Sequence, residues 1–192
     1  MLLALAGVTG VGKSYYKDKL VEKLGFEKVK IITTREPRIG EKDGEDKIFV
    51  TPTDLQNLRD EGKIAFEFDL CGNTYAYTYE ALNSCQNIVF ESHYDTIFDF
   101  KKVCPDLCVI YFFPKDIEIA KDKTRQRKLS SQVEHDRLLE IDEHYKRITT
   151  DEHLRSMFDY FLYNDYNQAS EDEFIGLVRQ LLLEEKAGNR GI

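Results

Sequence analysis

The chain has 192 residues, which is enough for one domain with a hydrophobic core, and its composition is that of an ordinary globular protein. Its formal net charge of −8 argues against a general binder of nucleic acids or anionic membranes, and no segment approaches the ~18 apolar residues of a membrane span. The four cysteines form no C-x-x-C pair, so we expect reduced thiols and a cytoplasmic protein.

The first 24 residues predict a strand, a glycine-rich loop and a helix. The apolar run "MLLALA" precedes "GVTGVGKS", and residues 16–24 carry apolar side chains at helical spacing. Residues 7–14 fit the pattern G-x-x-x-x-G-K-[ST], in which backbone N–H groups and the positive end of a helix dipole converge on phosphate oxygens. Lys13 would reach the β- and γ-phosphates, and the Ser14 hydroxyl would hold Mg²⁺.

Further elements follow in chain order. We expect strands at 29–34, 48–50, 64–70, 73–79, 87–92, 107–113 and 160–165, with 64–79 forming an aromatic hairpin. A helix should begin with Thr51 as its N-cap, the segment 116–148 should be helical with a break at 129–132, and a last helix should begin at Ser170.

Strands that alternate with helices imply an α/β fold with a parallel sheet covered on both faces. We expect one domain over 1–192, with a core of 1–33, 85–119 and 149–186. The aromatic section 34–84 would form one flap and the basic helical section 120–148 a second. Two such excursions beside a phosphate loop indicate an enzyme that closes around phosphates and excludes water.

A second candidate anion site lies in "TTREPRIGEKDGEDKIFV", where Arg35 and Arg38 stand three residues apart in a loop. Two guanidinium groups there could converge on one phosphate, although a solvated charged loop is the alternative. Together with "GNTYAYTYEAL" and "YNDYNQA", this stretch resembles guanylate kinase, whose acceptor signature runs T-T-R-x-P-R-x-G-E-x-x-G-x-x-Y-x-F. The resemblance extends with weaker identity from residue 1 to about residue 183.

The resemblance implies a three-layer P-loop kinase with a parallel sheet core, an inserted acceptor-binding flap and a helical lid. It implies an ATP site made of Gly10, Val11, Gly12, Lys13, Ser14 and Tyr15, with Asn164 beside the adenine. Acceptor contacts would come from Arg35, Arg38, Lys47, Tyr75 and Thr78. The lid arginines that neutralise the transferring phosphoryl group would be Arg125 or Arg127, together with Arg137.

Several positions depart from the family pattern at the acceptor base. Ile31 and Lys47 replace a serine and a tyrosine of the family, and the guanine-reading glutamate aligns with Phe66. Glu67 is then the expected base reader, and Glu91 serves either the metal, with Ser14, or the base. These changes leave the identity of the base open.

The reaction that this pattern favours is ATP plus GMP to ADP plus GDP with Mg²⁺, and the expected partners are small nucleotides. A related kinase with another phosphorylated acceptor, such as a different nucleoside or sugar phosphate, is the first alternative. A non-catalytic guanylate kinase-like module that binds proteins is the second. Whether the chain is a monomer or a homodimer stays open.

Overall fold

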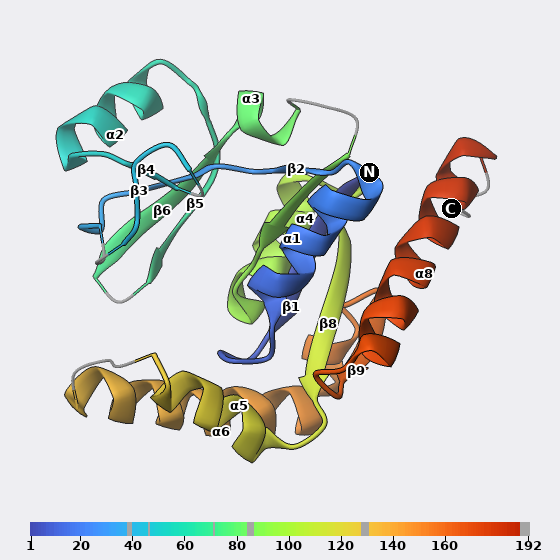
Figure 1. Ribbon diagram of the computed structural model, residues 1–192. Helices are drawn as coiled ribbons and strands as arrows, with labels where there is room; N and C mark the ends of the chain where they lie inside the picture. Colours follow the sequence, from blue (N-terminus) through green and yellow to red (C-terminus); the bar gives the residue numbers. More distant parts are fainter. Residues whose placement is uncertain (38–39, 46, 71, 84–86, 128–130, 189–192) are drawn as a thin grey trace.

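Two β-sheets of different kinds organise the chain (Figure 1). The structure is a computed structural model and describes residues 1–37, 40–45, 47–70, 72–83, 87–127 and 131–188. The core sheet has the spatial order β2 (Glu27–Lys28), β7 (Ile88–Glu91), β1 (Leu2–Gly7), β8 (Cys108–Pro114) and β9 (Tyr160–Asn164). All its neighbouring strands are parallel, as the alternation of strands and helices predicts.

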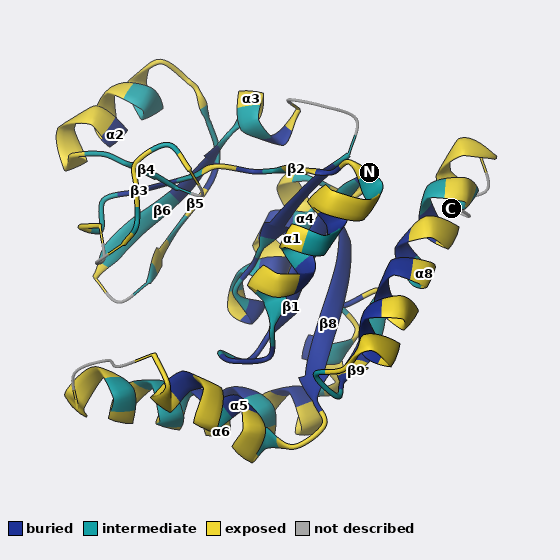
Figure 2. Cartoon of the chain, in the orientation of Figure 1, coloured by how far each residue is buried: buried dark blue, intermediate teal, exposed yellow. Residues whose placement is uncertain are grey.

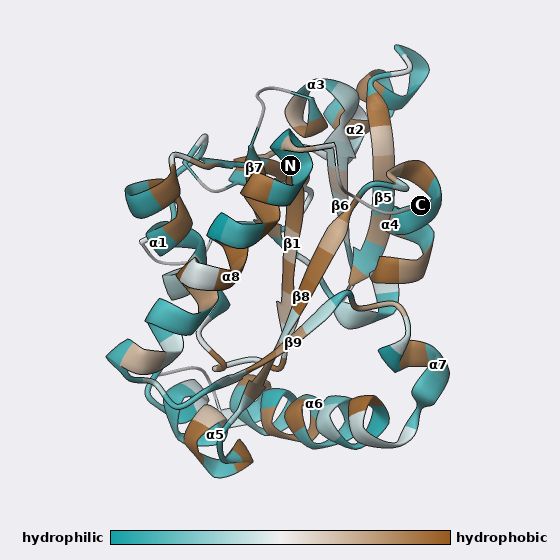
Figure 3. Cartoon of the chain, turned by 90° about the vertical axis from the view of Figure 1, so that its right-hand side faces the viewer, coloured by the Kyte–Doolittle hydropathy of each residue, from teal (hydrophilic) through white to brown (hydrophobic). Residues whose placement is uncertain are grey.

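Helices cover both faces of the core sheet, so β1 and β8 are apolar on both sides and almost fully buried (Figures 2 and 3). Leu3 and Leu5 of β1 pack in one cluster with α1 (Lys13–Leu24) and α8 (Gln168–Lys186). Ala4 and Ala6 face the opposite cluster, which includes α4 (Ile97–Val103) and α7 (Glu152–Arg155). This is the expected three-layer α/β architecture.

The flap carries a second, mixed sheet. Its spatial order is β4 (Lys47–Phe49), β3 (Ile31–Thr33), β6 (Asn73–Thr78) and β5 (Ile64–Leu70), with the helices α2 (Pro52–Asp60) and α3 (Tyr79–Leu82) beside it. The aromatic hairpin is confirmed as β5 and β6, and Thr51 caps α2 in a reciprocal capping box with Asp54.

The strand expected at 29–34 is observed as β3 over Ile31–Thr33, and a separate short strand, β2, precedes the expected range and belongs to the other sheet. β2 pairs with β7 of the core, whereas β3 pairs with β4 and β6 of the flap. The chain therefore changes sheets between Lys28 and Ile31, and the flap sheet begins at Ile31.

Two helices of the second flap, the lid, lie across one end of the core sheet (Figure 1). They are α5 (Ile117–Arg125) and α6 (Ser131–Thr150), and a short 3₁₀ helix, η1 (Tyr94–Thr96), precedes α4. Residues 129 and 130 of the expected break lie outside the described residues. The last helix begins at Gln168, two residues before Ser170, because the side chain of Asn167 provides its cap.

Among the described residues, no helix is both long and apolar enough to cross a bilayer. Cys104 is half-buried and Cys108 is buried. Cys71 and Cys85 lie outside the described residues.

Candidate active site

The glycine-rich loop joins the end of β1 to the first turn of α1, and its backbone requires glycine at two positions. Gly10 and Gly12 have φ angles of 85° and 97°, which side chains of L-residues rarely adopt. A Cβ on Gly10 would lie 2.2 Å from the carbonyl oxygen of Ala120 in α5, and one on Gly12 would lie 2.9 Å from Nδ2 of Asn164. The loop is thus packed tightly between the lid and the end of β9.

Lys13 closes back onto this loop. Its Nζ donates to the carbonyl oxygens of Gly7 (2.7 Å) and Val8 (3.0 Å). Burial lowers the pKa of Lys13 below its usual value, and the carboxylate of Glu91 opposes that shift in part. A buried ammonium beside a glycine loop is a strong attractor for an anion, because the low local dielectric strengthens the interaction.

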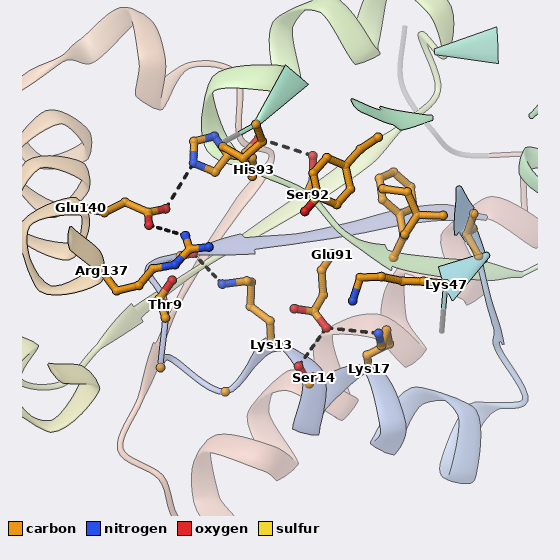
Figure 4. A pocket seen from close by; sticks show the side chains of 18 of the residues that line it. Thr9, Lys13, Ser14, Lys17, Lys47, Glu91, Ser92, His93, Arg137 and Glu140 are labelled. Carbon is orange, nitrogen blue, oxygen red and sulfur yellow. Dashed lines mark hydrogen bonds and ion pairs between the residues drawn. The ribbon is translucent and has the colours of Figure 1, made fainter. Parts of the chain in front are cut away.

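Ser14 and Glu91 meet beside the loop (Figure 4). Ser14 Oγ donates to Glu91 Oε1 at 2.9 Å, and Lys17 Nζ lies 3.1 Å from the same oxygen. Burial alone would raise the pKa of Glu91, but the ammonium groups of Lys17 and Lys13 and the Ser14 hydrogen bond lower it. The ionised carboxylate and the hydroxyl are oxygen donors of the kind that Mg²⁺ uses together with phosphates and water.

A cavity of about 710 Å³ opens between the phosphate loop, the flap and the lid. Cations outnumber acids among its described lining residues, although the whole chain is net negative. The charged lining residues are Lys13, Lys17, Asp18, Lys28, Glu41, Lys47, Glu91, Lys123, Arg127, Arg137 and Glu140. An excess of cations inside an acidic protein favours a polyanionic ligand.

Arg137 of α6 enters this cavity from the lid (Figure 4). Its Nη1 donates to Glu140, and Oε1 of Glu140 lies 3.6 Å from Nε2 of His93, which follows β7. Burial would raise the pKa of Glu140, but His93 and Arg137 outweigh burial and lower it to about 2. The carboxylate therefore stays ionised and links the lid helix to the core.

The side chains of the two other expected lid arginines, Arg125 and Arg127, lie in different places relative to the cavity. Arg127 lines the cavity. Arg125 does not line it: its Nη1 lies 2.5 Å from Asp122 Oδ1 and 4.0 Å from Glu118 Oε2 on its own helix. Of the two arginines that the sequence left open, the structure brings only Arg127 to the site.

His144 is a buried histidine of α6 that also lines the cavity. Its Nε2 lies 3.0 Å from the Tyr111 hydroxyl, and its ring stacks on Tyr94 with centroids 3.6 Å apart. Burial lowers the pKa of His144 to about 2, and the nearby ammonium of Lys13 adds to the shift. The imidazole is therefore neutral at physiological pH.

In the flap, Glu41 forms ion pairs with two of the predicted acceptor residues, Arg35 and Lys47. Arg35 Nη2 contacts both its oxygens, at 2.7 and 3.0 Å, and Lys47 Nζ lies 3.4 Å from Oε1. Lys47 and Tyr75 line the cavity, whereas Arg35 stands behind Glu41 and does not. Arg38 lies outside the described residues.

Two other predicted acceptor residues are not brought to the cavity. Phe68 and Leu70 of β5 line it, and because successive strand residues point to opposite faces, Glu67 points away and bonds to Arg59 Nε at 2.9 Å. Thr78 caps α3, accepting from one of its amides at 3.1 Å. Neither the expected base-reading role of Glu67 nor the expected acceptor contact of Thr78 fits this geometry.

Both the nitrogen and the oxygen of the Asn164 side-chain amide form hydrogen bonds beside the phosphate loop. Nδ2 donates to the carbonyl oxygen of Val11 (2.8 Å), while Oδ1 accepts from the Tyr16 hydroxyl (2.7 Å) and the Tyr166 amide (2.7 Å). The side chain is buried. Asn164 therefore braces the loop. It also lines the second cavity, so its expected place beside the adenine stays a prediction.

A second cavity of about 380 Å³ lies on the other side of the loop. Tyr15 is half exposed beside it and donates its hydroxyl to Glu171, and Lys123 Nζ stands 4.7 Å above the ring of Tyr166. The lining residues are Gly12, Tyr15, Tyr16, Lys123, Asn164, Tyr166, Asn167 and Gln168. Aromatic rings and amides suit a flat heterocycle.

Some site residues were not singled out from the sequence, although spacing signals were present. Lys17 stands four residues after Lys13, and Glu140 three residues after Arg137, so each pair shares a helix face. His93 follows the core strand β7 by two residues and lines the cavity.

Comparisons with known proteins agree with this geometry. A family model described as guanylate kinase matches residues 1–173. The chain is 24% identical over 183 residues to a guanylate kinase from Clostridioides difficile (strain 630), covering 93% of this chain and 86% of that protein. It is 27% identical over 171 residues to one from Streptococcus thermophilus (strain CNRZ 1066), covering 86% and 79%.

The fold is also similar to a solved structure. The crystal structure of guanylate kinase from Anaplasma phagocytophilum aligns with a TM-score of 0.67 and 20% identity, over 94% of this chain and 85% of that one.

Proposed function

The chain belongs to the guanylate kinase family, and from that premise we propose that it is an ATP-dependent, cytoplasmic nucleoside-monophosphate kinase that phosphorylates GMP with Mg²⁺. A phosphate oxygen of GMP attacks the γ-phosphorus of ATP. The bond from that phosphorus to the β–γ bridging oxygen breaks, and the products are GDP and ADP.

One observation carries this proposal: the phosphate loop, the flap and the lid surround a single cavity and each presents a cation to it. Lys13 comes from the loop region, Lys47 from the flap and Arg137 from the lid. Phosphoryl transfer asks for positioning and for positive charge around spreading negative charge, and it needs no covalent nucleophile.

The donor half of the site would hold ATP. We expect the loop amides from Gly10 to Tyr15 and the ammonium of Lys13 to bind the phosphates. The second cavity, with Tyr15, Lys123 and Tyr166, would take the adenine. Mg²⁺ would supply positive charge that neutralises the phosphate oxygens of ATP. Ser14 and Glu91 fit as its protein partners, because an ionised carboxylate and a hydroxyl already meet there.

The acceptor half would hold the monophosphate in the flap. Arg35, Arg38, Lys47 and Tyr75 are the proposed contacts, and Arg35 would exchange its Glu41 partner for the phosphate. On the lid, Arg127 and Arg137 would stabilise the equatorial oxygens of the transferring group, which is where the charge develops.

Steady-state assays of ADP release with ATP, GMP and Mg²⁺ test the proposal. Lys13→Ala should lower kcat by on the order of 10²–10³-fold, because a preorganised contact to the transferring phosphate is lost. Lys19→Ala is the matched control, since Lys19 is on the same helix but lines neither cavity; its Nζ lies 2.6 Å from Glu22 Oε2 and 5.6 Å from the ring centroid of Tyr15. Retention of more than about a tenth of the wild-type rate in Lys13→Ala would contradict the loop as the ATP site.

Absence of turnover by the wild-type protein with every nucleoside monophosphate tested would contradict the proposal. Retained ATP binding would then favour a kinase with another phosphorylated acceptor, and loss of ATP binding would favour the protein-binding module.

A further inference from the structure

The acceptor side of the large cavity has an aromatic wall. Phe68 and Tyr75 line it with their rings stacked, centroids 5.4 Å apart and planes at 13°. Leu70 completes this wall. Tyr77 and Phe90 border the cavity with ring centroids 5.1 Å apart, but each is only 2% exposed, so they support the wall and offer no free ring face. Such a surface offers area for stacking a flat ring.

Every described carboxylate that lines this cavity already has a cationic partner. The pairs are Asp18 with Lys28 (2.7 Å), Glu41 with Arg35 (2.7 Å), Glu91 with Lys17 (3.1 Å), and Glu140 with Arg137. Taking Asp18, Glu91 or Glu140 for a base would leave a cation without its partner, and that cost would offset the new hydrogen bond. Glu41, which Arg35 would release for the acceptor phosphate, keeps Lys47 Nζ 3.4 Å from its Oε1.

The two acids nearest the wall in sequence face the other way. Glu67 bonds to Arg59, and Asp69 accepts from the Thr74 hydroxyl at 2.7 Å. Both stand at odd positions of β5, whereas Phe68 of the wall stands at an even one. The hydroxyl of Tyr77 donates to the carbonyl oxygen of Glu91 (3.3 Å).

We propose, on the basis of the proposed function, that the enzyme recognises its acceptor base by stacking on this aromatic wall and not through any carboxylate of the described residues that reads hydrogen-bond donors. The acceptor class is then nucleoside monophosphates in general, purine and pyrimidine alike, with the phosphate held by the flap cations. A hydroxyl group on the wall can either donate or accept a hydrogen bond, so it does not favour one base over another.

The size of the expected selectivity follows from the chemistry of the wall. A site that hydrogen-bonds a substrate group rejects analogues that lack it by roughly 10⁴–10⁵-fold, because its buried polar group is left unpaired. An apolar pocket discriminates by only about 10–200-fold. We therefore expect kcat/KM values for GMP, AMP, UMP and CMP to fall within about 200-fold of one another.

Kinetics and calorimetry with these four monophosphates test the inference and separate it from the proposed function. Transfer to GMP with a preference above about 10⁴-fold would overturn the inference and leave the kinase in place. No transfer, with similar Kd values for all four, would overturn the kinase and leave the stacking site in place. Neither transfer nor binding would overturn both.

A change of one side chain should create the missing selectivity. Phe68→Glu puts a carboxylate on the cavity face of β5, where it can accept from guanine N1–H and the amino group. It should raise the GMP-to-AMP ratio of kcat/KM by at least about tenfold. Glu67→Gln, one residue away on the opposite face, should leave that ratio unchanged, and a shift would overturn the inference.

Phe68→Leu keeps the wall apolar but removes the ring, so it remains informative if the glutamate variant does not fold. It should weaken binding of all four monophosphates by a similar factor, on the order of tenfold, because a stacking partner is lost. Weakened binding of GMP alone would overturn the inference.

Discussion

Asn164→Ala should destabilise the protein far more than a typical substitution of a polar residue. The amide makes three hydrogen bonds, to the carbonyl oxygen of Val11, the hydroxyl of Tyr16 and the amide of Tyr166. Asn164 is 3% exposed, so water does not replace these bonds readily. A buried polar group that loses its partner costs about 1–3 kcal/mol, and three such losses at the lower limit give roughly 3 kcal/mol.

That free energy should appear as a drop of about 6–12 °C in Tm, since 1 kcal/mol corresponds to roughly 2–4 °C in a chain of this size. Urea unfolding gives the free energy directly, and calorimetry gives the Kd for ATP. Asn167→Ala is the matched control: it removes the cap of α8 and should cost about 1 kcal/mol. Destabilisation of Asn164→Ala no greater than the control, combined with selective loss of ATP affinity, would refute the bracing role.

Three further predictions concern the charged groups of the site. Glu140→Gln should lower kcat roughly 10–100-fold with both KM values nearly unchanged, because Arg137 loses the carboxylate that positions it; steady-state kinetics with an unchanged kcat would contradict this. The unfolded imidazole of His144 binds a proton below about pH 6.5, whereas burial holds the folded pKa at about 2. Stability should therefore fall as the pH drops below about 6.5, by up to about 1.4 kcal/mol per pH unit from this residue, and His144→Phe should flatten the slope in urea unfolding between pH 7 and 5; parallel slopes would speak against it. Glu91→Gln should raise the Mg²⁺ concentration for half-maximal activity roughly tenfold, and an identical Mg²⁺ titration would exclude its proposed metal role.

Features that depend on contiguous residues could be predicted from the sequence. The phosphate loop is one, because its glycines, Lys13 and Ser14 act within one strand–loop–helix unit. The capping box at Thr51 and the aromatic hairpin are others. Each feature is determined by residues that lie close together in the sequence, so contacts with distant parts of the chain do not change it.

Features that depend on the direction of a side chain or on contacts between distant parts of the chain could not be predicted from the sequence. A shift of one residue along β5 exchanges Glu67 for Phe68 at the cavity, and the sequence pattern does not set that register. The resemblance places Asn164 beside the adenine, and its hydrogen bonds to Val11 and Tyr16 could not be read from the sequence because those residues lie 153 and 148 positions away. The choice between Arg125 and Arg127 depended on how the helix end turns, which only the structure resolves.

The place where the flap sheet is inserted also bears on how such enzymes diversify. The chain leaves the core after β2 and returns at β7, and these two strands are neighbours that pair Glu27 with Ile88 and Lys28 with Val89. Residues 31–78 therefore form a cassette whose exchange by recombination would leave the phosphate loop, encoded before residue 24, untouched. The rings of Phe66 and Tyr77, which pack on Phe100 of the core, are among the contacts that would need to be kept. Acceptor choice and donor binding can thus be inherited separately.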